Sequence, residues 1–297
     1  MQSKVLAALA AASIGWGLAG VGTRFVFAEG TTTFTVVATR VVVALIFVLA
    51  IGHRRLGEIT ASAWRDGSVI GVLRIGVAPA LFISSLQYVS AGIEGIFITL
   101  IPAVTAALAA VALRERLDRN QMLGLAIGLL GTVLIVVSGE SGIADGGDIK
   151  LGSLFALSGV VVGATSGVLT RRYAPLHATT QLAIPMFVAG AVVAVATGLV
   201  LRDIDPGGVS KTAWPVLIAL GVGSTFLPFF ATLFASRHTT AARVALTGYL
   251  APVIGVIAGV VLLGEVLTAP IVIGACLALV GIAVAGRRRR VAPAVAS

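Results

Sequence analysis

The stretch IPAVTAALAAVALRE, residues 101–115, returns in outline 150 positions later as APVIGVIAGVVLLGE, residues 251–265. Each is an apolar run with a proline at its second position and a glutamate at its fifteenth. Aligned without a gap, residues 100–131 and 250–281 share nine identities, which include this proline and this glutamate. Further upstream, WGLAGVGTR (16–24) aligns with GATSGVLTR (163–171). The chain is therefore predicted to contain two related halves.

Composition places both halves in a membrane. Residues of the set AVILMFWYC make up 58% of the 297 residues, and only 11% are charged. The mean hydropathy is +1.08. Soluble domains are about 45–50% apolar and about 25% charged. This chain has too few polar residues to cover a water-facing surface, so we predict an all-α integral membrane protein.

Ten uncharged or nearly uncharged runs are long enough to span a bilayer, which takes about 20 apolar residues. Two of them tolerate one arginine each, Arg40 in the second and Arg74 in the third. The loops between the runs are too short to hold a soluble catalytic domain. The predicted spans are Val5–Thr23, Gly30–Gly52, Gly67–Ala91, Gly95–Leu113, Asn120–Gly139, Leu151–Thr170, Tyr173–Leu201, Thr212–Ser236, Val244–Gly264 and Val266–Gly286.

The basic residues predict the orientation. If both termini are cytoplasmic, the inner side holds fifteen lysines and arginines and the outer side holds four, namely Arg24, Lys150, Arg202 and Lys211. Cytoplasmic loops carry such an excess, so we expect a multi-pass protein of the cytoplasmic membrane with both ends inside. The net charge of +9 is spread over several inner segments. Topology explains this charge, so no nucleic-acid partner is predicted, and the closing run GRRRR (286–290) is expected to anchor the last span and to contact lipid headgroups.

Five spans per half is an odd number, so the second half is expected to enter the membrane from the opposite side. Pro102 and Pro252 then lie toward the middle of the membrane, where each leaves a carbonyl without its helical donor. Interrupted helices that meet near the midplane are typical of secondary transporters. We expect a first repeat over residues 1–139, an outer connecting loop over 140–150, a second repeat over 151–286 and a basic cytoplasmic tail over 287–297.

The stretch LQYVSAGIEGIFITLIPAVTAALAAVALRERLDRNQMLGLAIGLLGTVLIV (86–136) resembles the fourth and fifth spans of EamA-type transporters of the drug/metabolite transporter superfamily. The resemblance extends over the whole chain, and Trp16 and Arg40 also fit the family. It implies ten spans, cytoplasmic termini and a central cavity shared between the halves. The implied function is secondary transport of a small metabolite, such as an amino acid, a related metabolite or a drug-like compound. Glu94 departs from the family pattern, which has a small residue near the start of the fourth span.

Polar, aromatic and helix-breaking residues within the spans are the best candidates for a substrate site, because burying them in lipid is costly. For Arg40, a structural ion pair and a substrate contact both remain open. Glu94 has three possible roles: a partner of Arg40, a group that binds substrate or exchanges protons, or an interfacial carboxylate. Glu115 and Glu265, at the ends of spans, are expected to tie helix ends or loops together. The candidate substrate-binding residues are Trp16, Arg40, Tyr88, Glu94, Pro102, Tyr249 and Pro252.

Nothing in the sequence predicts an enzyme, a metal or a cofactor. His53, His177 and His238 lie on different inner loops without the HExxH spacing of zinc enzymes. The repeated glycine patterns lack the Lys-Ser or Lys-Thr that follows a phosphate-binding loop, and they fit helix packing instead. The alternative to a transporter is a membrane scaffold or receptor-like protein. The sequence is compatible with a monomer and with a homodimer.

Overall fold

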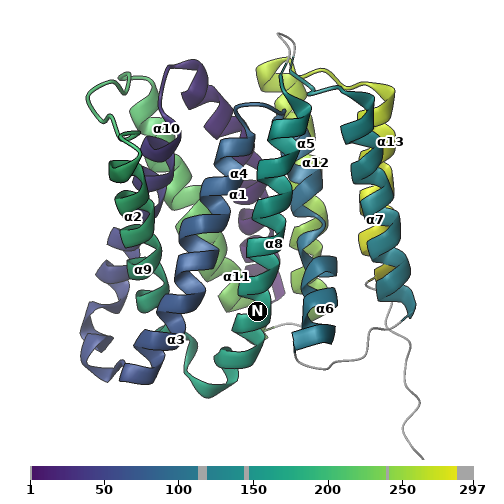
Figure 1. Cartoon of the computed structure of the whole chain (residues 1–297). Helices are drawn as coiled ribbons and strands as arrows, with labels where there is room; N and C mark the ends of the chain where they lie inside the picture. The colour runs from purple at the N-terminus through teal and green to yellow at the C-terminus, as the bar shows by residue number, and fades with distance from the viewer. Residues whose placement is uncertain (1, 113–118, 144–146, 239–240, 286–297) are drawn as a thin grey trace, which may run out of the picture.

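The computed structural model describes residues 2–112, 119–143, 147–238 and 241–285. Helices account for most of these residues, which contain no β-strand. The helices stand side by side in one bundle (Figure 1). In the first half they are α1 (Gln2–Ala28), α2 (Thr33–Gly52), η1 (His53–Glu58), α3 (Ala61–Gly71), η2 (Val72–Val77), α4 (Ala78–Ser85), α5 (Ala91–Ile98), α6 (Ile101–Ala112) and α7 (Arg119–Ser138).

The second half repeats this order with small differences in length. Its helices are α8 (Ile149–Tyr173), η3 (Ala174–Leu176), α9 (Thr179–Val200), α10 (Ala213–Ala219), η4 (Leu220–Phe226), α11 (Leu227–His238), α12 (Ala241–Leu263) and α13 (Ala269–Ala285). Eight helical stretches of the described chain are long and apolar enough to cross a membrane, and two shorter apolar helices lie at Leu250–Leu263 and Ala269–Gly281. Lipid offers no hydrogen bonds, so even the valine-rich segments must form helices there. The all-α membrane class is confirmed.

Several predicted span limits were wrong, because they were drawn from charges: the first span was expected to end at Thr23 but α1 ends at Ala28, and the seventh was expected to begin at Tyr173 but α9 begins at Thr179. The third span was expected to begin at Gly67, but α3 begins at Ala61, where the Thr60 hydroxyl accepts a hydrogen bond from the Ala63 N–H at 3.2 Å. The fourth span was expected to begin at Gly95, but α5 begins at Ala91 with Ser90 as its N-cap. N-caps of this kind start helices irrespective of nearby charge. Glu94 consequently lies in the first turn of α5.

Two short π-helical segments, η2 and η4, interrupt the third and eighth helical stretches at matching positions. A proline follows each one as the second residue of the next helix, Pro79 in α4 and Pro228 in α11. Proline has no N–H for the carbonyl four residues earlier and its ring clashes with that carbonyl. The backbone responds with bonds over five residues, from the Ala78 N–H to Leu73 and from the Leu227 N–H to Val222. Such π-bulges are frequent at functional sites.

Pro102 and Pro252, which recur at an offset of 150, have different effects on their helices. The fourth stretch is broken before Pro102, since α5 ends at Ile98 and α6 begins at Ile101. The ninth runs through Pro252 as part of the continuous α12. At the break, the Thr99 hydroxyl donates to the Ile96 carbonyl at 2.6 Å, a local bond that competes with the helical pattern. The equivalent residue of the second half is Tyr249, which has no hydroxyl near its backbone. The expected interruption is therefore present in the first half only.

Helices α7 and α13 lie together at one edge of the bundle (Figure 1). Glycines make this crossing close: a Cβ on Gly131 would lie 2.6 Å from the Gly274 oxygen, and one on Gly281 would lie 2.6 Å from the Gly124 oxygen. Gly131 corresponds to Gly281, and Gly124 to Gly274, at the offset of 150. The same pair of contacts is thus made twice, as a twofold relation between the halves requires.

Even one methyl group at this crossing should push the helices apart. We expect Gly131→Ala to lower stability by about 1–3 kcal/mol, the usual cost of overpacking. The measurement is the melting temperature of the purified protein in detergent. Gly57→Ala is the matched control, because no atom lies within 4 Å of a Cβ at that position. Equal melting temperatures for the two variants would contradict the close crossing.

Candidate functional site

A carboxylate is enclosed inside the bundle at Glu94, on α5. The residue is 8% exposed. Its carboxylate lies against α1 where Gly20 leaves room for it, since a Cβ on Gly20 would be 3.5 Å from Glu94 Oε2. No described residue donates a hydrogen bond to either carboxylate oxygen. Burying a charge without a partner is expensive, so this position is not explained by packing.

The guanidinium of Arg40, on α2, meets the second half of the chain. Arg40 Nε donates to Thr225 Oγ1 at 3.4 Å, and Thr225 belongs to the π-helical segment η4. The same hydroxyl donates to the Leu220 carbonyl, five residues earlier, at 3.3 Å. The wider turn of η4 therefore directs Thr225 toward Arg40. The other N–H groups of Arg40 have no hydrogen-bond partner among the described residues.

Arg40 and Glu94 attract each other without direct contact. Each is the other's main electrostatic partner of opposite charge. However, no nitrogen of Arg40 lies within 4.0 Å of a Glu94 carboxylate oxygen. The direct ion pair between Arg40 and Glu94, one of the roles expected from the sequence, is therefore not formed in this conformation. What the helices hold instead is an arginine and a carboxylate, both inside membrane-crossing stretches and without a direct ion pair.

A second buried carboxylate, Glu265, has a full set of partners at the N-terminus of α5. Its Oε1 accepts a hydrogen bond from the Ala91 N–H at 2.7 Å and its Oε2 accepts one from the Gly92 N–H at 3.2 Å. A carboxylate at a helix N-terminus is favoured by the free N–H groups and the helix dipole. Burial raises the pKa of Glu265, and these two backbone bonds oppose that rise. Glu265 thus ties a helix end, as expected from the sequence; Glu115 lies outside the described residues.

Arg24 of α1 completes this contact. Its Nε lies 3.5 Å from Glu265 Oε1, and its Nη1 donates to the carbonyls of Leu86 and Val89 at 3.2 Å each. We refer to Arg24, Glu265 and the N-terminus of α5 as the Arg24–Glu265 clamp. It joins α1, the turn before α5 and the connection between α12 and α13. The first and second halves of the chain are therefore held together at one end of the bundle.

The segment after α7 closes around the clamp through its backbone. The Ser90 N–H donates to the Ser141 carbonyl at 2.9 Å, and the Val266 N–H donates to the Gly142 carbonyl at 3.1 Å. Gly142 has a φ of +71°, which favours glycine. A Cβ there would also lie 2.6 Å from Ser90 Oγ. Backbone hydrogen bonds therefore connect the segment after α7 to the turn before α5 and to the residue after Glu265.

Two of the aromatic candidates take different places. Trp16, 38% exposed, lies on α1 one turn from Gly20 and two turns from Arg24. It is hence on the face of α1 that carries the Gly20 contact to α5 and the Arg24 contact to the turn before α5. Tyr88 lies in the turn before α5 and stacks on Phe155 of α8, with ring centroids 6.0 Å apart. Tyr88 therefore packs on α8, apart from Arg40 and Glu94. Tyr249 is on α12, and its side chain lies outside the described part of the structure.

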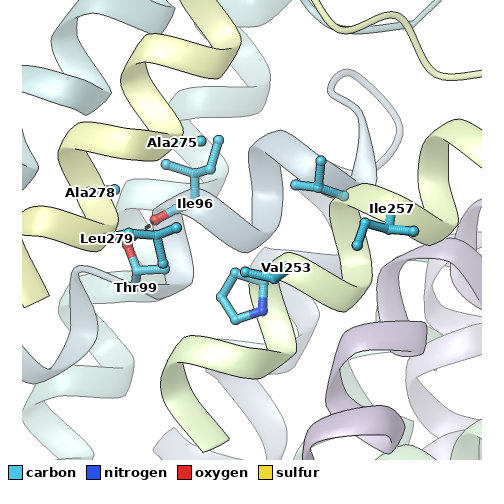
Figure 2. A pocket seen from close by; sticks show the side chains of 9 residues that line it. Ile96, Thr99, Val253, Ile257, Ala275, Ala278 and Leu279 are labelled. Atoms are coloured by element: carbon cyan, nitrogen blue, oxygen red, sulfur yellow. Dashed lines mark hydrogen bonds between the residues drawn. The ribbon is translucent and has the colours of Figure 1, made fainter. Parts of the chain in front are cut away.

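The prolines do not meet in one polar cavity. Pro102 is exposed near the start of α6, whereas Pro252 is buried against Gly95 of α5. Pro252 lines a groove of about 140 Å³ between α5, α12 and α13 (Figure 2). Its one hydroxyl, that of Thr99, is already bonded to Ile96. This groove offers apolar contact only; it is lined by Ile96, Thr99, Pro252, Val253, Val256, Ile257, Ala275, Ala278 and Leu279.

The sequence contains a second pair of repeated prolines. Pro79 and Pro228 recur at an offset of 149, in the same way as Pro102 and Pro252, and they mark the two π segments. No spacing in the sequence singles out Thr225. Asp66 lies just before the predicted start of the third span at Gly67, but it is buried in α3, where it accepts hydrogen bonds from Arg65 Nε and His177 Nε2, each at 2.9 Å.

Removing the charge of Glu265 should weaken the clamp. We expect Glu265→Gln to destabilise the protein by about 1–3 kcal/mol, because it leaves the partly buried Arg24 without a counter-charge and weakens the hydrogen bonds that the carboxylate accepts from α5. The double variant Arg24→Gln/Glu265→Gln should lose less than the sum of the single losses, which a double-mutant cycle of thermal unfolding in detergent measures. Glu29→Gln is the control, since Glu29 is exposed and bonded only to hydroxyls of Ser210 and Thr212. Strict additivity would refute the coupling.

Comparison with known proteins agrees with this architecture. An uncharacterized transporter of Archaeoglobus fulgidus is 25% identical over 233 residues, 76% of this chain and 80% of its own length. The uncharacterized transporter YyaM of Bacillus subtilis is 25% identical over 253 residues, 84% of this chain and 80% of its own. One solved crystal structure shares the fold, with a TM-score of 0.65 at 21% identity over 96% of this chain and 98% of that one. The EamA-like transporter family matches residues 3–137 and again residues 150–287. The chain is thus a multi-pass membrane protein that belongs to the EamA-like transporter family.

Proposed function

We propose that the protein is a secondary transporter that moves a small metabolite across the cytoplasmic membrane by alternating access, as an exporter. An amino acid, a related metabolite or a drug-like compound is the expected cargo. The observation that carries the proposal is the pair of ionisable side chains, Arg40 and Glu94, which lie on separate helices within membrane-crossing stretches: the described residues give Arg40 one long hydrogen bond and Glu94 none through its carboxylate. Ionisable groups within membrane spans mark substrate or ion pathways. Arg40 also contacts η4, so the proposed site draws on both halves of the chain.

We further propose that the bundle consists of ten spans in two inverted repeats, over residues 1–139 and 151–286, joined by an outer loop at 140–150. Three features support this. The family pattern matches twice, η2 and η4 occupy corresponding positions, and the helix contacts are reciprocal. The contact of α1 with α12 corresponds to the contact of α8 with α6, and the contact of α3 with α9 corresponds to that of η4 with α2. In both, exchanging the two halves turns one contact into the other.

The Arg24–Glu265 clamp then closes the outer end of the pathway in this conformation. It lies at the opposite end from the inner loops that carry most of the lysines and arginines. Opening toward the outside would require breaking the ion pair and releasing the N-terminus of α5. Because α5 carries Glu94 in its first turn, movement at the clamp would be transmitted directly to the proposed site. This supplies a physical link between the gate and the cargo.

The orientation can be tested with single cysteines. Cys276, a free cysteine on α13, is first replaced by serine. Cysteines are then introduced at Lys4 and Glu58, which should face the cytoplasm, and at Lys150 and Lys211, which should face outward. A membrane-impermeant maleimide added to intact cells should label only the outer pair, and permeabilised cells should be labelled at all four. Labelling of the Lys4 or Glu58 positions in intact cells would contradict the orientation.

Transport itself can be measured as efflux of a metabolite panel from proteoliposomes. We expect Pro102→Ala and Pro252→Ala to lower the transport rate more than the folded yield, because Pro102 follows the break between α5 and α6 and Pro252 packs against α5, the helix that carries Glu94. Pro270→Ala is the matched control, since Pro270 lies in the first turn of α13, where proline leaves the helical bonds intact. Equal losses of rate and yield would mark the prolines as packing residues. No flux of any panel member would favour a scaffold or receptor-like protein.

A further inference from the structure

We propose that the apolar groove between α5, α12 and α13 is a binding site for one acyl chain of a membrane phospholipid, which enters it sideways from the bilayer. The groove has a volume of about 140 Å³, and side chains of all three helices line it (Figure 2). Phospholipid binding here requires only that the protein spans a membrane. It is independent of the cargo and of the transport pathway.

The groove opens onto the surface that faces lipid. Its floor is formed by Ile96, Thr99 and Ala278, which are buried. Its rim belongs to α12, where Val253 is 40% exposed and Ile257 is 58% exposed. All five residues lie in the apolar helical stretches described above. The groove is therefore continuous with the lipid-facing surface, and hydrocarbon is the medium at its mouth.

The lining of the groove disfavours water and polar solutes. Thr99 is the one residue of the lining with a polar side chain, and its hydroxyl donates to the Ile96 carbonyl at 2.6 Å. A bound water needs about two to four polar partners, and the aliphatic and proline side chains of the groove provide none. A hydrocarbon chain, by contrast, matches this lining and leaves no polar group of its own without a partner.

The groove runs in the same direction as lipid chains. It extends from Pro252 to Ile257 on α12 and from Ala275 to Leu279 on α13, which is about 6–8 Å along helices that stand side by side (Figure 1). Ala275 also lies six residues inside α13, which begins at Ala269, or about 9 Å from the helix end. The groove is consequently at the depth of acyl chains, below the headgroups.

The described part of the chain leaves this space unfilled. Helices α12 and α13 follow each other in sequence, and both pack on α5, but they make little contact with each other. An acyl chain between them would restore the van der Waals contacts that an unfilled groove lacks. It would also touch α5 at Ile96 and Thr99, close to Gly95, against which Pro252 packs. The bound lipid would thus join α13 to the rest of the bundle.

The test uses the purified full-length protein in detergent with one equivalent of a phosphatidylglycerol that carries a photoreactive diazirine in the middle of one acyl chain. After illumination, mass spectrometry of peptides locates the labelled residues. We expect the groove segments of α12 and α13 to be labelled at least about fivefold more than the exposed face of α7, because burial favours apolar chains. The same lipid with the diazirine in its headgroup should not label the groove.

Two further comparisons assign the labelling to the groove and to the chain. Ala275→Phe places a ring in the groove and should abolish the preference, whereas Ile273→Phe is the matched control, because Ile273 is 51% exposed on the same helix and lies outside the lining. Unlabelled dioleoyl phosphatidylcholine should compete as well as dioleoyl phosphatidylglycerol, since the chains are the same and only the headgroup differs. Should a variant fail to fold, this competition in the unaltered protein still decides.

Three results would overturn the inference. The first is equal labelling of the groove and of α7, and the second is a preference for the groove that persists in folded Ala275→Phe. The third is competition by free oleate without competition by either phospholipid, which would identify a fatty acid as the occupant. None of these results bears on transport, which the proteoliposome assay decides separately.

Discussion

Lipid cannot form hydrogen bonds with the backbone, and the rest of this structure depends on that constraint. Every segment at membrane depth must satisfy its own N–H and C=O groups, so the chain folds as helices even where valine dominates. Regular helical hydrogen bonding is interrupted beside three prolines of these segments. At Pro79 and Pro228 the lost bond is replaced by bonds over five residues. At Pro102 the helix breaks, and the Thr99 hydroxyl covers a carbonyl beside the break.

Two buried carboxylates, Glu265 and Glu94, differ in role because their surroundings differ. Glu265 accepts hydrogen bonds from two N–H groups of α5 and forms an ion pair with Arg24, so its carboxylate joins the two halves of the chain. Glu94, one turn further along the same helix, has no such partners. Glu94 belongs to α5, and Glu265 is hydrogen-bonded to the N-terminus of α5. A ligand at Glu94 and the clamp would therefore act on the same helix. In our proposal this coupling links cargo binding to the opening of the bundle.

The glycine crossing of α7 and α13 has a different role. Its contacts are made in reciprocal pairs, Gly131 with Gly274 and Gly281 with Gly124, and they allow the two backbones to approach closely. Van der Waals packing of this kind is a main source of helix association in membranes, where no hydrophobic driving force exists between helices. The crossing lies at the edge of the bundle, away from Arg40 and Glu94. It holds the halves together without occupying the proposed site.

The sequence by itself determined the membrane class, the approximate spans and the relation between the halves, because hydropathy and repeated prolines are local properties of the chain. It also marked Arg40 and Glu94, since charges are conspicuous in apolar runs. Only the tertiary structure decided their relation. Whether two residues 54 positions apart form a direct ion pair depends on how α1, α2, α5 and η4 pack. The limits of α3 and α5 were misjudged because capping by Thr60 and Ser90 outweighed charge. The helix breaks before Pro102 and continues through Pro252, a difference that the shared prolines do not reveal, because the local bond of the Thr99 hydroxyl to the Ile96 carbonyl has no counterpart at Tyr249.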